Sequence, residues 1–156
     1  MNTPSFLCFN GQILPADQPI FRSDNRGYRY GDGIFETMKM VNHQIPLFSY
    51  HFDRLSDGLQ LLKYEVPPEI TSQKLIDEIK LLSERNSVSN LCRVRLSAYR
   101  DINNGTKYII ECFPETSLVN ELNENGFVIG LYPGARKSCD TFSNLKSANY
   151  LPYVMA

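Results

Sequence analysis

Residues 26–37 are Arg26-Gly27-Tyr28-Arg29-Tyr30-Gly31-Asp32-Gly33-Ile34-Phe35-Glu36-Thr37, with three glycines within seven residues and the aromatic residues Tyr30 and Phe35 around the last two. Glycine allows positive φ and a close approach of the backbone to another group. We expect a tight turn here that leads into a strand, with a ligand site as the alternative. The stretch is not a phosphate-binding loop of the P-loop kind, because no Gly-Lys-Ser or Gly-Lys-Thr follows it.

Two hairpins are predicted along the first third of the chain. Asn10-Gly11 separates two short apolar runs, the first beginning at Phe6, and Asn-Gly in that setting is the strongest local hairpin signal. A second hairpin is expected at Val41-Asn42-His43-Gln44, between residues 34–40 and 45–48. Hairpins pair their strands antiparallel, so the pattern favours an α+β fold over a parallel sheet.

Two helices are expected next, each with one buried face. Ser49 can cap the first helix, and Thr71 can cap the second. Apolar side chains recur at three- and four-residue spacing in both segments, which is typical of a helix packed on a core. The first set is Phe52, Leu55, Leu59 and Leu62, and the second set is Leu75, Ile76, Ile79 and Leu82.

Further strands are predicted at residues 91–99, 107–113 and 126–132. We therefore expect residues 1–114 to form an α+β domain, an antiparallel sheet with two helices packed on one face. A linker at 115–120 then leads to residues 121–156, the truncated start of a second domain. A piece of about 40 residues cannot bury an independent core, so it must pack on the first domain, on a partner chain or on sequence that is missing.

Composition is that of a globular protein, with 42% hydrophobic and 21% charged residues and a net charge of −1. Such a charge gives no electrostatic reason to expect nucleic acid or an anionic membrane as a partner. No apolar run approaches the roughly 18 residues of a membrane span. Met1-Asn2-Thr3-Pro4 is not the start of a signal peptide, so a cytoplasmic location is expected.

No metal site is expected from the cysteines and histidines. The four cysteines are scattered along the chain, and the two histidines lie far from any cysteine pair. Zinc sites usually take their ligands in close-spaced pairs. We therefore expect free thiols in a reducing compartment and no metal-dependent catalysis.

Two basic residues have both an ordinary and a functional interpretation. Arg54, in His51-Phe52-Asp53-Arg54-Leu55, projects about 120° from the centre of the apolar stripe of the first helix. On that flank it is either a solvated arginine or a phosphate ligand, which the guanidinium fork suits. Lys146, in Asn144-Leu145-Lys146-Ser147-Ala148-Asn149-Tyr150-Leu151, is by default a surface lysine. It becomes a nucleophile for carbonyl groups only when desolvation or a nearby cation lowers its pKa.

The order of these segments carries more information than any one of them. Residues 26–36 match R-G-Y-x-Y-G-D-G-[IV]-F-E, residues 51–55 match H-x-D-R-L, and Lys146 begins K-S-x-N-Y-L. In this order the chain, from about Phe6 to Ala156, resembles the class IV aminotransferases. These fold-type IV enzymes use pyridoxal 5′-phosphate (PLP) and include branched-chain aminotransferases, D-amino-acid aminotransferases and 4-amino-4-deoxychorismate lyases.

The resemblance implies three residues that bind the cofactor. Lys146 is expected to form the covalent bond to PLP and then to carry the proton between the substrate Cα and the cofactor atom C4′. Arg54 corresponds to the arginine that holds the PLP phosphate in these enzymes. Tyr150 corresponds to the tyrosine that hydrogen-bonds the phenolic oxygen of the cofactor.

Three further residues are implied at the substrate. Tyr30 and Phe35 correspond to positions that line the substrate pocket. Arg93 resembles an arginine near the substrate carboxylate in branched-chain enzymes; alternatively, it is a strand arginine that faces solvent, on the same face as Arg95. The loop after this strand has no Arg-x-His pair, which D-amino-acid aminotransferases use to hold the carboxylate, and this argues against D-amino acids as substrates.

The leading expectation is a PLP enzyme that moves an amino group between an amino acid and a 2-oxo acid, as a homodimer like its relatives. One alternative is the lyase that releases 4-aminobenzoate and pyruvate from aminodeoxychorismate, and another is a non-catalytic half-protein on the same scaffold. Relatives are about twice as long, and their later half supplies a glutamate for the pyridine nitrogen and a loop around the phosphate. The 156 residues alone are therefore expected to bind PLP weakly and to turn over little.

Overall fold

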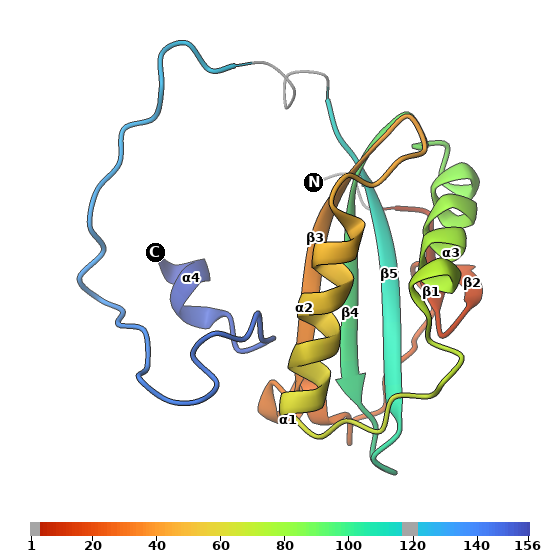
Figure 1. Cartoon of the computed structure of the whole chain (residues 1–156), viewed down its shortest axis with the longest axis horizontal. Helices are drawn as coiled ribbons and strands as arrows, with labels where there is room; N and C mark the ends of the chain where they lie inside the picture. Colours follow the sequence, from red (N-terminus) through yellow and green to blue (C-terminus); the bar gives the residue numbers. More distant parts are fainter. Residues whose placement is uncertain (1–3, 117–121) are drawn as a thin grey trace.

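The computed structural model describes residues 4–116 and 122–156, and its centre is a five-stranded antiparallel sheet in the order β2-β1-β5-β4-β3 (Figure 1). The strands are β1 (Phe6–Phe9), β2 (Gln12–Pro15), β3 (Gly33–Val41), β4 (Leu91–Arg100) and β5 (Thr106–Pro114). The helices are α1 (Arg26–Tyr30), α2 (Phe48–Leu61), α3 (Ser72–Arg85) and α4 (Leu151–Met155). The expected α+β fold, with an antiparallel sheet and two helices on one of its faces, is confirmed.

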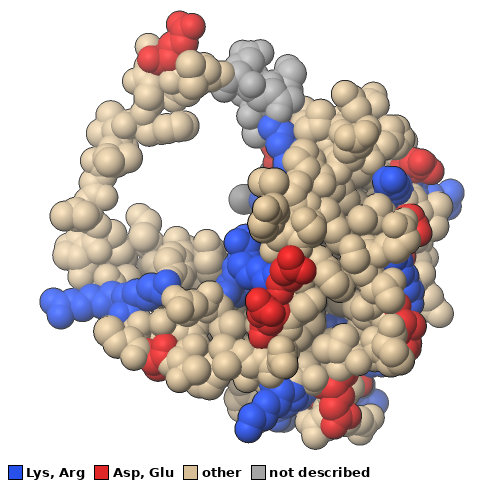
Figure 2. Space-filling view, viewed as in Figure 1, with Lys and Arg blue, Asp and Glu red and all other residues tan. Residues whose placement is uncertain are grey.

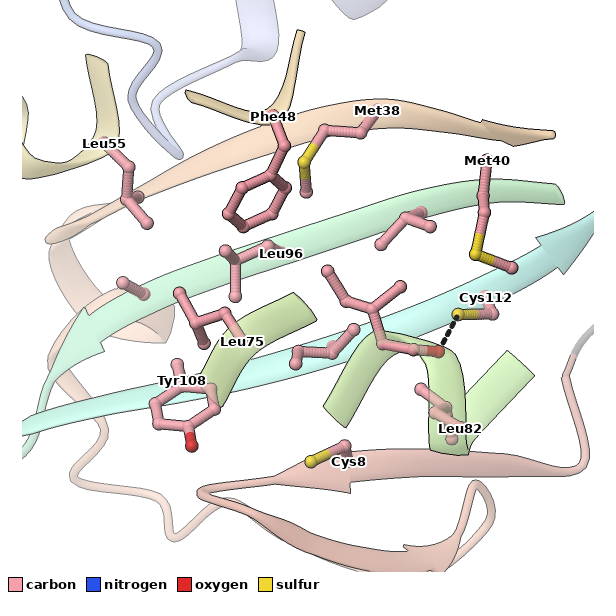
Figure 3. Packing of buried hydrophobic residues seen from close by; sticks show 14 of the residues in the cluster. Cys8, Met38, Met40, Phe48, Leu55, Leu75, Leu82, Leu96, Tyr108 and Cys112 are labelled. Atoms are coloured by element: carbon pink, nitrogen blue, oxygen red, sulfur yellow. Dashed lines mark hydrogen bonds between the residues drawn. The ribbon is translucent and has the colours of Figure 1, made fainter. Parts of the chain in front are cut away.

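Alternation along the three long strands sends one set of side chains toward α2 and α3. From the sheet this set includes Met38 and Leu96, which are almost completely buried. Leu55 of α2 and both Leu75 and Leu82 of α3 meet them, and Figure 3 shows these side chains gathered between the helices and the strands. The apolar periodicities of the two helices therefore predict their buried faces correctly.

The opposite face of the sheet is more polar. Leu7, Tyr99 and Ile109 form a small separate apolar cluster there, on β1, β4 and β5. Toward β3 the same face carries Arg95, which lies 3.9 Å from the carboxylate of Glu111 on the neighbouring strand. The main core thus lies between the sheet and the two helices, and charged groups occupy much of the other face.

Of the two predicted hairpins, the first is confirmed and the second is wrong. Asn10 and Gly11 both have positive φ, and β1 and β2 pair directly across them. At residues 41–44 the chain makes only one isolated bridge, and residues 45–48 form no second strand. Phe48, the last residue of that run, begins α2 instead. Its ring is buried in the core, and the centre of the ring lies 6.3 Å from that of Phe52.

One of the two predicted helix caps is correct. The Thr71 side chain accepts a hydrogen bond from the Lys74 backbone N–H at 3.2 Å and so caps α3. Ser49 does not cap α2, because it already lies inside the helix. The N-cap is Leu47, which has a φ of 59° and makes no side-chain capping bond. The start of α2 is therefore set by the burial of Phe48 and not by a capping side chain.

The strand predicted at 126–132 is also wrong. Residues 122–146 contain no strand, and Val128 and Leu131 are fully exposed. A strand needs a neighbour to satisfy its backbone groups, and Figure 1 shows this segment running away from the sheet before it returns to α4. Most of the predicted linker at 115–120 falls in 117–121, which are outside the described residues. Met1-Asn2-Thr3 are outside them too.

No helix within residues 4–116 and 122–156 has the length and apolar character that crossing a membrane requires. The same residues contain no group of three or more histidine, cysteine, aspartate or glutamate side chains arranged to hold a metal ion. Cys8, Cys92 and Cys112 are buried with free thiols, and Cys139 is free and exposed. Three of the four cysteines thus serve as apolar core residues.

The position of the core predicts very different costs for two neighbouring leucines of α3. Leu82 is 0% exposed, whereas Leu81 is 58% exposed. Leu82→Ala leaves a cavity against the sheet and should lower the free energy of unfolding by about 2–5 kcal/mol. Leu81→Ala, the control, should change it by about 0.5 kcal/mol or less. Urea denaturation followed by circular dichroism measures both values, and equal losses would contradict this packing.

Candidate active site

Residues 146–148 pair with the beginning of β3 and thereby fix the position of Lys146. The Phe35 N–H donates to the Lys146 carbonyl at 3.0 Å, and the Ala148 N–H donates to the Gly33 carbonyl at 2.8 Å. Ile34 and Ser147 form an antiparallel bridge between these two bonds. β3 is an edge strand of the sheet, so its outer backbone groups can bond this segment.

Two glycines of the 26–37 stretch lie where the chain enters β3, beside residues 146–148. Gly31 ends α1 with a φ of 66°, which glycine adopts without steric cost. At Gly33 an added Cβ would lie 3.0 Å from the Ala98 carbonyl oxygen and 3.5 Å from the Ala148 Cβ. A side chain there would crowd the Ala98 carbonyl of β4, whereas its contact with Ala148 would be an ordinary van der Waals contact. The expected tight turn leading into a strand is confirmed, since α1 and Gly31 lead directly into β3.

The Lys146 amine is partly buried beside an anionic and an aromatic group. Its Nζ lies 4.0 Å from Glu36 Oε2 and 5.3 Å from the centre of the Phe35 ring. Burial lowers the pKa of Lys146 below its ordinary 10.5, and Glu36 opposes this shift. The positive charges of Arg54 and Arg95 lower the same pKa further. A lowered pKa increases the fraction of neutral amine, which is the form that attacks carbonyl groups.

Glu36 is a buried carboxylate on the helix-facing side of β3, with only 1% of its surface exposed. Arg54 of α2 donates to it twice, from Nε and from Nη2, both at 2.6 Å. His51, three residues earlier on the same side of α2, places Nδ1 2.8 Å from Oε2. Burial alone raises the pKa of Glu36, but hydrogen bonds from Arg54 and His51 outweigh it and hold that pKa below 4.5. Glu36 is therefore ionised at neutral pH and joins β3 to α2.

About half of the Arg54 side chain is open to solvent, at 53% exposure. Within residues 4–116 and 122–156 its Nη1 donates to no acceptor. Arg54, Lys146 and Tyr150 border one opening of about 260 Å³, and a neighbouring opening of about 420 Å³ also includes the first two. Figure 2 shows basic side chains gathered where the C-terminal segment meets the rest of the molecule. The structure thus brings together the three residues that the resemblance assigns to the cofactor.

Phe35 connects this group to the open face of the sheet. Its ring meets the Tyr150 ring edge-on, with centres 5.4 Å apart. Arg95 Cζ lies 4.3 Å from the centre of the same Phe35 ring. Arg95 also donates to the Ser97 hydroxyl at 3.1 Å and lies near Glu111, so neighbours on β4 and β5 hold it in place. A cation therefore stands beside Phe35, a residue expected to line the substrate pocket.

Tyr30 and Arg93 lie apart from this group in the described part of the chain. The Tyr30 ring is 68% exposed, and Arg26 Cζ lies 5.4 Å from its centre. Arg93 forms an ion pair with Glu115 at 3.2 Å. Neither residue lines the two openings beside Lys146, and their roles at the substrate stay predictions.

Three residues of this group had no predicted role: Glu36, His51 and Arg95. Glu36 nevertheless carried a signal, since alternation with Ile34 and Met38 places it on the apolar face of its strand. A carboxylate on such a face needs partners, and the nearest basic residues in the first helix were candidates. His51 belongs to the motif that identified Arg54, and the three-residue spacing puts both side chains on one side of the helix.

Hydrogen exchange can test the pairing of residues 146–148 with β3. Ala148→Pro removes the N–H that bonds the Gly33 carbonyl and should release this segment from the strand. The Phe35 N–H would then lose protection and exchange faster by about tenfold or more. Ala148→Gly keeps the N–H, so it is the control and should retain slow exchange. Slow exchange at Phe35 in the proline variant would contradict the pairing.

Glu36 should make the stability of the chain depend on pH. Its pKa is lower in the folded chain than the ordinary 4.5, so the ionised carboxylate stabilises the fold above that pH. As the pH falls from about 4.5 through the folded-state pKa, this contribution is lost and the free energy of unfolding should decrease. Glu36→Gln should show a smaller decrease over the same range. Urea titrations at several pH values measure both slopes, and identical slopes would rule out this role of Glu36.

Comparison with known proteins places the chain in a family. The family model for amino-transferase class IV matches residues 33–156, from the start of β3 onward. The D-alanine aminotransferase of Listeria innocua serovar 6a is 28% identical over 133 residues, which cover 76% of this chain and 45% of that protein. The D-alanine aminotransferase of Listeria monocytogenes serotype 1/2a (strain 10403S) is 25% identical over 128 residues, covering 78% and 43%. The chain spans less than half the length of these relatives.

A solved structure shares the fold described above. The branched-chain amino acid aminotransferase of T.th., in its structure with pyridoxamine 5′-phosphate, has a TM-score of 0.64 and 17% sequence identity. The similarity covers 74% of this chain and 42% of that one. At such low identity the likeness concerns the fold alone, whereas the family model covers most of the sequence. The chain belongs to the class IV aminotransferases.

Proposed function

We propose that this chain provides the lysine-bearing half of a PLP-dependent aminotransferase, which moves an amino group between an amino acid and a 2-oxo acid. The observation that carries the proposal is the opening bordered by Lys146, Arg54 and Tyr150. These side chains supply a nucleophilic amine, a guanidinium fork and a phenol, which suit an aldehyde, a phosphate and a phenolic oxygen. The likeness to an aminotransferase that binds pyridoxamine 5′-phosphate supports the same cofactor.

The residues around the opening fit PLP in chemical type. Arg54 has half of its side chain exposed and would hold the phosphate through its unbonded edge. The Tyr150 ring is held edge-on by Phe35 and stacks on Tyr153 with centres 4.7 Å apart, so its hydroxyl has a defined position. When bound, PLP supplies an aldehyde that captures amines and a ring that accepts electrons.

Lys146 would serve twice in this reaction. Its amine would hold the cofactor, and when free it would be the group placed to take the proton from the substrate Cα. Partial burial keeps the pKa of Lys146 below 10.5, which favours the neutral amine that accepts this proton. Glu36 lies 4.0 Å away and stabilises the protonated form that results.

The positive charge of Arg95 beside Phe35 supports a substrate that carries a carboxylate. The Arg95 guanidinium, 4.3 Å from this ring, can bind a carboxylate, and Arg93 is the alternative that the resemblance implies. The lack of an Arg-x-His pair in the loop at 101–105 argues against D-amino acids. The curated relatives, however, are D-alanine aminotransferases, so the proposal extends to amino acids of either configuration.

We also propose that full activity needs groups that this chain does not contain. The chain matches 43% and 45% of the two Listeria relatives. By the resemblance, the glutamate expected at the pyridine nitrogen and the loop expected around the phosphate would lie in the part of the relatives that it does not match. The assembled enzyme is proposed to be a cytoplasmic homodimer, as expected from the resemblance.

Borohydride trapping tests the cofactor lysine. With PLP and sodium borohydride, Lys146 should be labelled at lower PLP concentration than other lysines, because its lowered pKa leaves more neutral amine. Peptide mass spectrometry measures the labelled fraction at each lysine. Lys107 is the matched control, since its side chain is 40% exposed against 31% for Lys146.

Two variants complete this experiment. Lys146→Ala should abolish the labelling at low PLP concentration together with the visible absorption of the bound cofactor. Lys107→Ala should leave both signals unchanged. Labelling at low PLP concentration that persists without Lys146 would refute the proposed function.

A further inference from the structure

We propose that Glu36 is a positioning residue for the cofactor phosphate: it holds one edge of the Arg54 guanidinium so that the other edge faces the phosphate. The inference rests on the proposed function, because it takes Arg54 as the phosphate ligand. It assigns a role to a buried carboxylate that touches neither the substrate nor the cofactor. Its action passes entirely through Arg54.

The geometry of the ion pair supports this division of the guanidinium. A guanidinium carries five N–H groups in a rigid plane. Glu36 receives one from Nε and one from Nη2, both at 2.6 Å, so two points fix the plane of the Arg54 group. The edge formed by Nη1 and the second Nη2 hydrogen remains, and it matches the two-oxygen contact that phosphate accepts from arginine. The exposure of 53% for Arg54 shows that a ligand can reach this side chain.

His51 holds the carboxylate in turn. Its Nδ1 lies 2.8 Å from Glu36 Oε2, and an ionised carboxylate only accepts hydrogen bonds, so Nδ1 carries the proton. The Nδ1 atom then cannot also accept from Arg54 Nη2 at 3.3 Å, and that hydrogen stays free for a ligand. His51 is therefore the support of Glu36 and not a competitor for the arginine.

The cations around Glu36 outnumber its single negative charge. Besides His51, the charged groups within 4.0 Å of its carboxylate in the described residues are Arg54 from α2 and Lys146 from the C-terminal segment. Two cations and one carboxylate give a local charge of +1 when His51 is neutral and Lys146 is protonated. A phosphate arriving at Arg54 therefore meets two cations beside one carboxylate, with Asp53 and Asp57 lining the neighbouring opening, and Glu36 taken alone repels it.

Because of this repulsion, the direction in which phosphate binding changes when Glu36 is removed distinguishes two possible roles. If Glu36 acted on the phosphate only through its charge, its removal would tighten phosphate binding. If it positions Arg54, its removal frees the guanidinium plane and weakens phosphate binding. The two effects oppose each other, and the expected result is weakening.

The experiment compares PLP with pyridoxal, which lacks the phosphate, as ligands of the 156-residue chain. The ratio of their dissociation constants, measured by visible absorption, isolates the contribution of the phosphate. Glu36→Gln, which keeps the shape and removes the charge, should lower the preference for PLP by about tenfold. Arg54→Ala should lower it to near unity, and Glu36→Gln added to Arg54→Ala should have no further effect.

Two more variants separate positioning from charge and from folding. Asp53→Asn removes a neighbouring negative charge on α2 that is not the ion-pair partner of Arg54, and it should leave the preference unchanged or raise it. Glu36→Asp keeps the charge but shortens the side chain and so loses the two-point contact with Arg54, and it should also lower the preference. Circular dichroism confirms the fold of each variant.

The outcomes distinguish this inference from the proposed function. An unchanged or raised preference for PLP in both Glu36 variants, together with a loss in Arg54→Ala, would overturn the positioning role and leave the proposed function intact. An unchanged preference in Arg54→Ala would overturn the phosphate assignment and this inference together.

Discussion

The carboxylate of Glu36 sets the relation between β3, α2 and the segment that carries Lys146. Alternation along β3 directs it toward the helices, into a position where it is 1% exposed. A buried carboxylate without partners is strongly destabilising, so basic side chains of α2 must face this strand. Arg54 and His51 meet that requirement and fix the rotation of α2 about its axis. The apolar residues of the helix then face the core.

β3 also holds the other parts of the site. Its outer edge bonds residues 146–148, its helix-facing side carries Glu36, and its opposite side carries Phe35. The carboxylate and the ring therefore lie on one strand, and backbone bonds to that strand hold the segment that carries the Lys146 amine. Groups held by a regular element keep their positions more closely than groups held by loops. The absence of a side chain at Gly33 is part of this arrangement, because an added Cβ would lie 3.0 Å from the Ala98 carbonyl oxygen of β4.

Much of the fold follows from patterns within short stretches of sequence. Asn10-Gly11 and Thr71 act on neighbouring residues, and the two helices bury the faces that their apolar spacing predicts. Prediction fails where a distant partner determines the structure. Phe48 starts a helix and not a strand because the core takes its ring. Residues 126–132 have the composition of a strand, but no strand of the described residues lies beside them to pair with.

At the site, too, a local pattern predicts the face of a strand but not which residue on that face lies beside a given partner. Period two places Arg93 and Arg95 on one face, but it cannot say which of them approaches Phe35. The antiparallel register answers this, since Thr37 lies opposite Arg95 and the ring is only two residues farther along β3. A slip of one residue would turn both arginines into the apolar core, so packing strongly specifies the register. The position of Arg95 beside the site is therefore a consequence of the same packing that buries Glu36.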